Sequence, residues 1–180
     1  MDDRASGTFL ASRAAVARRS AAGAIVEDGV LAGAVGAAVV ALWFLVLDVV
    51  HGAAFFTPSL LGSVLFQGRS PEDITSVDPA MVFAYTGLHG LLFIGAGLVI
   101  TWMFSQFERN PQFGMVLLLL FLLFEAIVMG LEFSIMPRLV GALGTWAVGL
   151  ANLLAAVAMF WFLLRRRPEA FAKLRKGWNE

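Results

Sequence analysis

The sequence predicts an all-α integral membrane protein, a four-helix bundle with a short amphipathic interfacial helix in the first outer loop. Three observations support this fold. Of the 180 residues, 59% are hydrophobic and 14% are charged, and the mean hydropathy of +0.82 is far above that of an average soluble domain. Four apolar stretches are each long enough to cross a hydrocarbon layer about 30 Å thick as a helix. Helix-start and turn signals separate these stretches.

The charge and cysteine content exclude several classes of function. Thirteen basic and thirteen acidic residues cancel, so the net charge does not favour nucleic-acid binding. Because the chain has no cysteine, disulfides, thiolate metal sites and cysteine nucleophiles are excluded. The expected partners are therefore the lipid bilayer and either other membrane subunits or a second copy of the chain, with no nucleic acid.

Residues 1–28 form a polar N-terminal segment that is rich in small residues and carries four arginines. Two interpretations fit this cytoplasmic or interfacial segment: a short helix lying at the membrane surface, or a frayed tail. At its end, Glu27 and Asp28 are suited to the positive end of a helix dipole. We therefore expect the first span to begin directly after them.

The first span, about 29–54, has two different halves. Its first half carries a strip of small residues, a pattern that lets helix backbones approach closely: Gly29, Gly33, Gly36 and Ala37. Its second half carries Asp48 and His51 one helical turn apart, so both point to one side of the helix. A charged Asp at the centre of a span costs about 2.5–3.5 kcal/mol on insertion scales, so this pair needs a partner or a task.

The connection of about 57–79 contains three helix-start signals, each a capping residue followed by proline. These are Thr57–Pro58, Ser70–Pro71 and Asp78–Pro79. The first predicts the short interfacial helix, which would cover the end of the bundle where Asp48 and His51 emerge. The last opens the second span.

Three further spans follow. The second, about 80–104, contains His89. The third, about 112–136, contains Glu125 and Glu132, which are seven residues apart and share one helix face. The fourth span covers about 140–164, and a basic cytoplasmic tail, 165–180, follows it.

The distribution of lysine and arginine predicts the orientation. Four arginines precede the first span and six basic residues follow the fourth, whereas the long first loop has one arginine, Arg69, against three acids. By the positive-inside rule, both termini are cytoplasmic and the long loop faces outward. We therefore expect a multi-pass protein of the cell (inner) membrane.

The ionisable residues of the spans predict a metal site near the outer leaflet. If the first span continues to about Phe56, then Asp48, His89 and Glu125 lie in one layer, roughly 8–11 residues below the outer surface. His51 and Glu132 lie in a shallower layer, at about 4–6 residues. Mixed imidazole and carboxylate ligands suit iron, copper or zinc. The predicted function is metal binding, with a redox or proton-handling role, and the expected ligands are Asp48, His51, His89, Glu125 and Glu132.

Other interpretations of these residues stay open. The chain could be a non-catalytic small subunit of a larger membrane complex, for example a respiratory one, with polar residues that serve helix contacts or a proton path. It could instead hold a b-type haem between His51 and His89, although the residue count separates them by about 7 Å along the axis. If the first span ends at His51, Asp48 and His51 would satisfy each other and the amides of the loop. Independently of where that span ends, His89 could hydrogen-bond a carbonyl or Thr86 across the bundle.

One segment carries a resemblance. The pattern D-x-x-H followed by F-x-T-P-x-x-L-G, between Asp48 and Gly62, is similar to that of uncharacterised bacterial four-span membrane proteins. The resemblance covers about one-tenth of the chain. It implies a bacterial origin and brings no activity with it.

Overall fold

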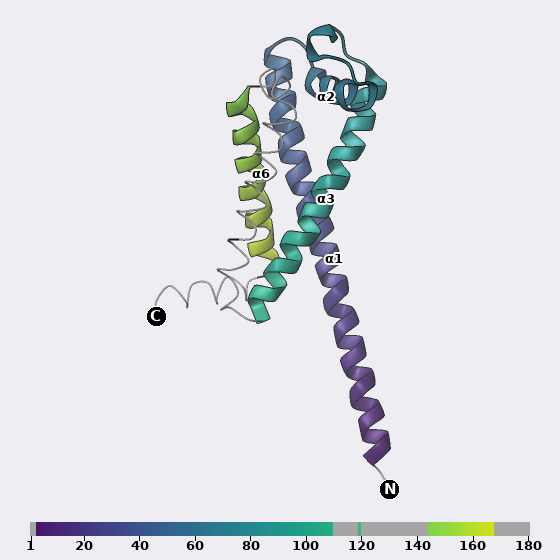
Figure 1. Ribbon diagram of the computed structural model, residues 1–180. Coiled ribbons are helices and arrows are strands. Elements are labelled where there is room, and N and C mark those ends of the chain that lie inside the picture. Colours follow the sequence, from purple (N-terminus) through teal and green to yellow (C-terminus); the bar gives the residue numbers. More distant parts are fainter. Residues whose placement is uncertain (1–2, 110–118, 120–143, 168–180) are drawn as a thin grey trace, which may run out of the picture.

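The computed structural model describes residues 3–109, 119 and 144–167, and the regular secondary structure of these residues is helical, with no strand (Figure 1). The all-α prediction is confirmed for this part of the chain. The predicted third span, 112–136, lies outside it. The described helices are α1 (Asp3–Val50), α2 (Phe56–Gln67), the 3-10 helix η1 (Pro71–Asp73), α3 (Pro79–Arg109) and α6 (Thr145–Arg166).

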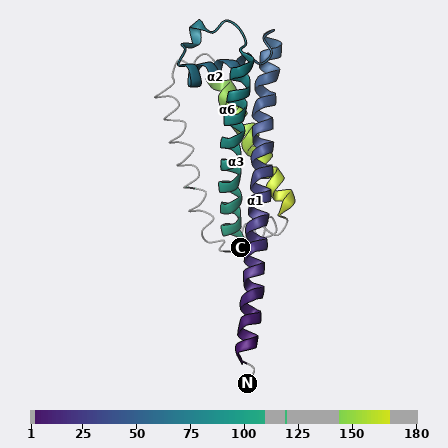
Figure 2. The same ribbon diagram turned by 90° about the vertical axis from the view of Figure 1, so that its right-hand side faces the viewer.

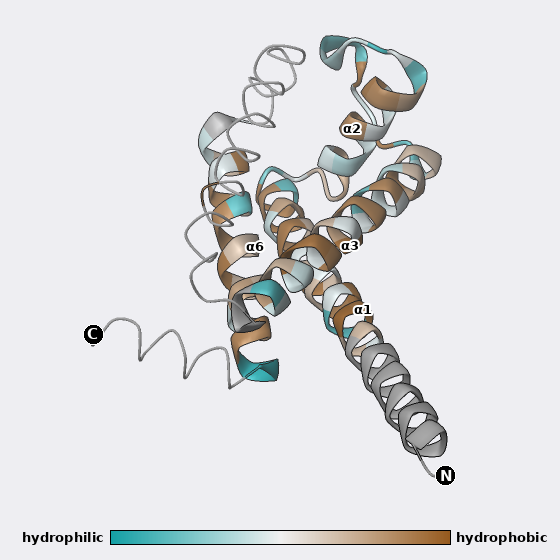
Figure 3. Ribbon diagram, turned by 60° about the horizontal axis from the view of Figure 1, so that its bottom comes forward, coloured by the Kyte–Doolittle hydropathy of each residue, from teal (hydrophilic) through white to brown (hydrophobic). Residues whose placement is uncertain are grey.

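Three of these helices are long and apolar enough to cross a membrane: Ala22–Val50, Pro79–Gln106 and Trp146–Arg166. They correspond to the predicted first, second and fourth spans. Large apolar side chains are exposed along all three, among them Leu91 of α3 and Trp161 of α6, and apolar residues cover much of these helices (Figure 3). Helices that face hydrocarbon are expected to expose such side chains, so the structure supports a membrane protein.

Both α3 and α6 run antiparallel to α1. Near the end of α1, Trp43 donates a hydrogen bond from Nε1 to the Ala147 carbonyl at the start of α6, whereas Asp28 meets Arg166 at the end of α6. Accordingly, the end of α3 and the start of α6 lie at opposite ends of the molecule (Figure 1). We call the end that holds α2 and η1 the capped end, and the end that holds Asp28 and Arg166 the ion-pair end.

A close crossing of α1 and α3 lies between these two ends, as the small-residue strip predicts. A Cβ atom added to Gly33 would lie 2.6 Å from the Ile94 Cα, and one added to Gly29 would lie 2.8 Å from the Leu98 Cα. On the other helix, a Cβ atom on Gly97 would lie 2.8 Å from the Gly33 Cα. Only glycine fits such an approach. Beyond this crossing, the two helices spread apart toward the capped end (Figure 1).

Helix α6 packs against α1 through contacts that each place a small residue of one helix against a larger residue of the other. One buried cluster joins Ala32 of α1 with Met159 and Leu163 of α6, and a second joins Val40 with two buried alanines of α6. The glycine strip contributes here as well, because a Cβ atom on Gly36 would lie 2.5 Å from the Met159 sulfur. The strip therefore serves two helix contacts at once.

The N-terminal segment differs from the prediction, because α1 is continuous from Asp3 to Val50 and has no break near residue 28. Its first part extends alone beyond the other helices (Figures 1 and 2). Residues 4–24 are rich in alanine and arginine, which are strong helix formers. Glu27 and Asp28 therefore lie inside a helix and do not cap a helix start. At 1.5 Å per residue the 48 residues of α1 measure about 72 Å, far more than a bilayer requires.

The end of α1 also differs from the prediction. The helix ends at Val50, before the predicted limit of residue 54. Gly52 and Phe55 follow with φ angles of 75° and 66°, in the left-handed region that a continuing helix cannot use. Asp48 therefore lies in the last turn of α1, and the depth count that assumed a helix to Phe56 does not apply.

The helix-start signals of the connection are confirmed at two of three places. Ser70 precedes η1, which begins at Pro71, and α3 begins at Pro79. The short helix α2 begins at Phe56, one residue before the predicted cap. Thr57 is therefore the second residue of α2, and its capping partner comes from another helix.

Candidate binding cavity

Asp48 of α1 caps the first turn of α2. Its Oδ2 accepts a hydrogen bond of 2.8 Å from the Thr57 backbone N–H, and its Oδ1 accepts one of 2.6 Å from the Thr57 hydroxyl. Both residues are buried. The other amides of this turn are provided for, because Phe56 donates to the Ala53 carbonyl and Ser59 to Phe55, while Pro58 has no N–H. The carboxylate thus satisfies the remaining amide and lies at the positive end of the α2 dipole.

Ser59 ties α2 to the start of α3. Its hydroxyl oxygen accepts a hydrogen bond of 2.8 Å from the Asp78 backbone N–H. The Asp78 carboxylate in turn accepts a bond of 2.9 Å from the Ala80 amide, which makes it the N-cap of α3. On the same side, Gly62 lies directly against the Met81 carbonyl. Helix α2 is therefore fixed to both diverging helices and closes the space between them at the capped end.

A cavity of about 580 Å³ lies in this space, bounded by α1, α2 and α3. We call it the wedge cavity. Most of its lining is aliphatic or aromatic, and its polar side chains are few. The lining residues are Val40, Ala41, Leu42, Phe44, Leu45, Asp48, Phe55, Thr57, Pro58, Leu61, Val77, Pro79, Val82, Phe83, Tyr85, Thr86 and His89.

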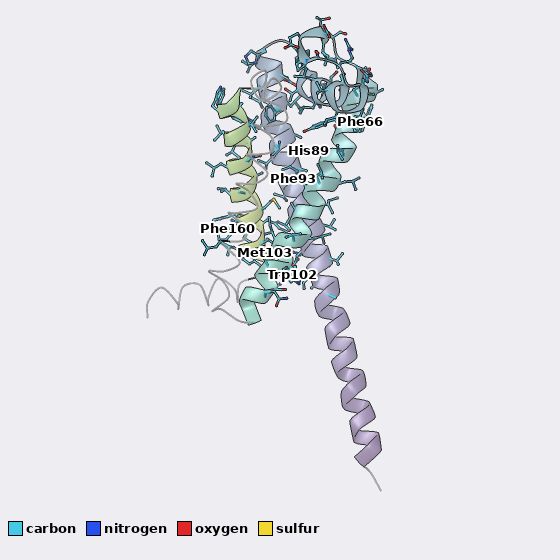
Figure 4. All side chains as sticks on the ribbon, in the orientation of Figure 1. Phe66, His89, Phe93, Trp102, Met103 and Phe160 are labelled. Atoms are coloured by element: carbon cyan, nitrogen blue, oxygen red, sulfur yellow. The ribbon has the colours of Figure 1, made fainter. Side chains whose placement is uncertain are left out.

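His89 lines the wedge cavity from α3, below α2 and on the side of the helix crossing (Figure 4). Its Nε2 lies 3.3 Å from the Ala37 carbonyl oxygen of α1. Since a carbonyl only accepts, Nε2 carries the proton of this hydrogen bond. The ring lies between Tyr85, which stacks on it with centroids 5.8 Å apart, and Phe93 at 4.7 Å. The expected hydrogen bond to a carbonyl across the bundle is thus confirmed.

His51 lies apart from the wedge cavity. It is exposed just after α1, where its Nδ1 donates to the Leu47 carbonyl at 2.7 Å. The interpretation in which Asp48 satisfies loop amides is confirmed through Thr57. The pairing of Asp48 with His51 is not seen, because each side chain has a different partner.

The depth of His89 separates it from Asp48. Its imidazole is level with Ala37, which precedes Asp48 by 11 positions, or about 16 Å along α1. Among the described residues, no group of three or more histidine, aspartate or glutamate side chains could hold a metal ion. Glu125 and Glu132 lie outside the described residues. The five-residue site with iron, copper or zinc therefore stays a prediction, and the described ligands do not form the single layer expected for it.

The two histidines do not fit an axial haem pair. Their carbonyl partners, Leu47 and Ala37, are ten positions apart on α1, or about 15 Å. Axial ligands must face one iron from opposite sides. His51 is exposed at the capped end while His89 lies toward the crossing, so this arrangement does not place them around one haem.

The sequence interpretation missed the apolar lining of the wedge cavity. Residues such as Leu42, Phe44 and Phe83 resemble ordinary lipid-facing positions, and no motif marks them. A usable signal was the glycine strip, because helices that touch at one point diverge further along. The cluster of helix starts in the connection was a second signal, since it predicts a helix over the opening.

Comparisons with protein-family models, curated proteins and solved structures found no match to this chain. The predicted resemblance to bacterial four-span proteins and the predicted role as a subunit therefore stay predictions.

Proposed function

We propose that this chain is a four-span inner-membrane protein that binds a lipophilic small molecule in the wedge cavity. The observation that carries the proposal is the cavity itself. Its volume of about 580 Å³ falls in the range of roughly 300–1,000 Å³ that is typical of small-molecule sites. An apolar lining with a few polar groups is also typical of such sites.

The position of the charges supports a membrane location for the cavity. Asp28 and Asp48 are 20 positions apart on α1, so about 30 Å separates them along the axis, which is the thickness of the hydrocarbon layer. Exposed tryptophans lie toward both ends, with Trp146 at the capped end and Trp102 and Trp161 at the ion-pair end. Interfacial tryptophans are common at both membrane surfaces. The wedge cavity, between His89 and α2, would then lie in one leaflet.

The direction of the helices supports four spans. Because α3 and α6 run in the same direction, the chain between them has to return from the ion-pair end to the capped end. The apolar stretch 112–136 is our proposed return span. Arginines at the end of α6 favour a cytoplasmic ion-pair end and cytoplasmic termini.

Single cysteines can test this orientation, because the natural chain has none. In intact cells, a membrane-impermeant maleimide should label Ser70→Cys on the capped side. It should label Ala22→Cys, at the start of the first candidate span, only after the cells are opened. Labelling of Ala22→Cys in intact cells, or protection of Ser70→Cys, would contradict the proposed orientation.

The ligand is expected to be lipophilic because of how the cavity opens. Helix α2 and its hydrogen bonds to α1 and α3 close the polar end. On the side of the helices, Leu42 and Phe83 line the cavity and are 60% and 78% exposed. In a bilayer these side chains face hydrocarbon, so a ligand would arrive from the lipid.

Binding can be measured at Tyr85, the single tyrosine of the chain, which lines the cavity. With 3-fluorotyrosine incorporated, the full chain in lipid nanodiscs should show one ¹⁹F resonance that shifts saturably with 2-methoxynaphthalene. Ala41→Phe should abolish the shift, because this exposed alanine lines the cavity. Ala38→Phe is the matched control, one turn earlier on α1, exposed and outside the lining. If neither this probe nor 2-naphthol shifts the resonance of the natural chain saturably, the proposal is overturned.

A further inference from the structure

The polar groups of the wedge cavity differ in whether the protein already satisfies them. At the α2 side, both Asp48 oxygens accept hydrogen bonds from Thr57. At the other side, Nε2 of His89 donates to Ala37. A neutral imidazole with its proton on Nε2 has an acceptor lone pair on Nδ1. No hydrogen bond to this Nδ1 is made by the described residues.

This distribution selects the chemistry of the ligand. A phospholipid would keep its headgroup at the membrane surface and place only an acyl chain beside His89. Its hydrocarbon would cover the Nδ1 acceptor without pairing it, and an unpaired buried acceptor is unfavourable. A molecule with a donor on its deep end would satisfy Nδ1 and keep its apolar part against the lining.

We propose that the ligand of the wedge cavity is a neutral lipophilic alcohol or phenol whose hydroxyl donates a hydrogen bond to Nδ1 of His89. This inference rests on the proposed function, because it names the ligand class of the same cavity. Tyr85 and Phe93 hold the imidazole between them, so the acceptor is fixed before the ligand arrives. The carboxylate at the other side of the cavity accepts two hydrogen bonds from Thr57 and caps α2.

Two probes of nearly the same shape test the inference: 2-naphthol, which has a hydroxyl donor, and 2-methoxynaphthalene, which has none. Both are titrated into the full chain in nanodiscs, with the fluorotyrosine resonance of Tyr85 as the readout. His89→Phe keeps an aromatic ring between Tyr85 and Phe93 and removes both nitrogens. For each probe, the dissociation constant of the variant is divided by that of the natural chain, and the two ratios are compared. Because each ratio concerns one probe, the different partitioning of the two probes into lipid cancels.

We expect His89→Phe to raise the dissociation constant of 2-naphthol by about fivefold to tenfold, the effect of one lost hydrogen bond. The binding of 2-methoxynaphthalene should change less than twofold. Equal ratios for the two probes would overturn the inference and leave the proposed function intact. Failure of both probes to bind the natural chain would overturn the proposed function itself.

A second measurement needs no substitution at His89. The chain has two histidines, so ¹⁵N-histidine spectra are simple, and His51→Gln assigns them. With 2-naphthol, the Nδ1 resonance of His89 should move in the direction of a nitrogen that accepts a hydrogen bond. With 2-methoxynaphthalene it should stay in place. An Nδ1 resonance that 2-naphthol does not move would overturn the inference even if His89→Phe fails to fold.

Discussion

Two buried aspartates of the same helix, Asp28 and Asp48, are stabilised in different ways at the two ends of the bundle. Asp28 is met by charge, with its oxygens 3.0 Å from Nε of Arg166 and 3.1 Å from Nε of Arg167. Asp48 is met by two neutral donors of Thr57. The two carboxylates are similarly buried, with 8% and 6% of their residue surface exposed. A buried acid can therefore be stabilised either by a cation or by a helix start.

The different contacts of Asp28 and Asp48 decide which end of the bundle can hold a ligand. At the ion-pair end, α6 reaches α1 directly, and Arg166 and Arg167 close the contact. At the capped end, α2 bridges α1 and α3 across a gap and leaves a cavity beneath it. An ion pair holds two neighbouring helices together, whereas a capped short helix covers an open space. Substitutions that separate these two roles can test this comparison.

Asp28→Ala should have the largest effect. The side chains of Asp28 and Arg167 are each 12% exposed, and removal of one member of a buried pair typically costs about 3 kcal/mol or more. We expect a loss of about 3 kcal/mol in the free energy of unfolding, measured by SDS titration of the detergent-solubilised chain. Asp73→Ala, an exposed acid of the outer connection, is the control and should change little. Equal effects of the two substitutions would show that the ion pair is not needed for stability.

Asp48→Ala should lower the free energy of unfolding by about 2 kcal/mol, the effect of hydrogen bonds to a charged group at a helix N-terminus. Its second effect should be specific to the capped end. Because α2 would lose its tie to α1, the ¹⁹F signal of Tyr85 should broaden or shift without ligand. Asp28→Ala should leave that signal unchanged. The opposite pattern would contradict the assignment of separate roles to the two ends.

Thr57→Val should cost about 1 kcal/mol. Valine keeps the shape of threonine and the backbone N–H that donates to Asp48, so only the hydroxyl bond of 2.6 Å is lost. The same SDS titration measures this effect. When Asp48 is already alanine, Thr57→Val should have almost no further effect, because the two groups form one interaction. Full additivity of the two substitutions would show that Asp48 and Thr57 do not form a single interaction.

Glu27→Gln should have the smallest effect, less than about 0.5 kcal/mol. Glu27 also pairs with Arg166, at 2.6 Å, but its side chain is 66% exposed, and solvent and salt screen such pairs. Unfolding should therefore differ between this variant and the natural chain only at low salt. Glu72→Gln, in the exposed connection, is the matched control. A Glu27→Gln effect as large as that of Asp28→Ala would show that exposure does not distinguish the two acids.

The sequence was a good guide to local features and a poor one to distances between helices. Asp78 and Pro79 begin α3 as predicted, because capping and proline preferences act within a few residues. Gly33 marks the helix crossing, since close backbone approach requires a missing side chain. The predicted depth of Asp48 was wrong because α1 ends early, at Val50. Gly52 and Phe55, which follow it, both have positive φ. Phe55 gives no sequence signal for that conformation.

Composition and periodicity by themselves determined that this protein is helical and apolar, with helices long enough to cross a bilayer. These properties follow from each segment's own hydropathy and length, so no knowledge of its neighbours is needed. Only the tertiary structure decided that Asp48 caps α2, that His89 bonds to Ala37, and that a cavity lies between them. The reason is physical: hydrogen-bond partners and enclosed volume depend on the angle at which helices cross, and one chain's residue pattern does not fix that angle.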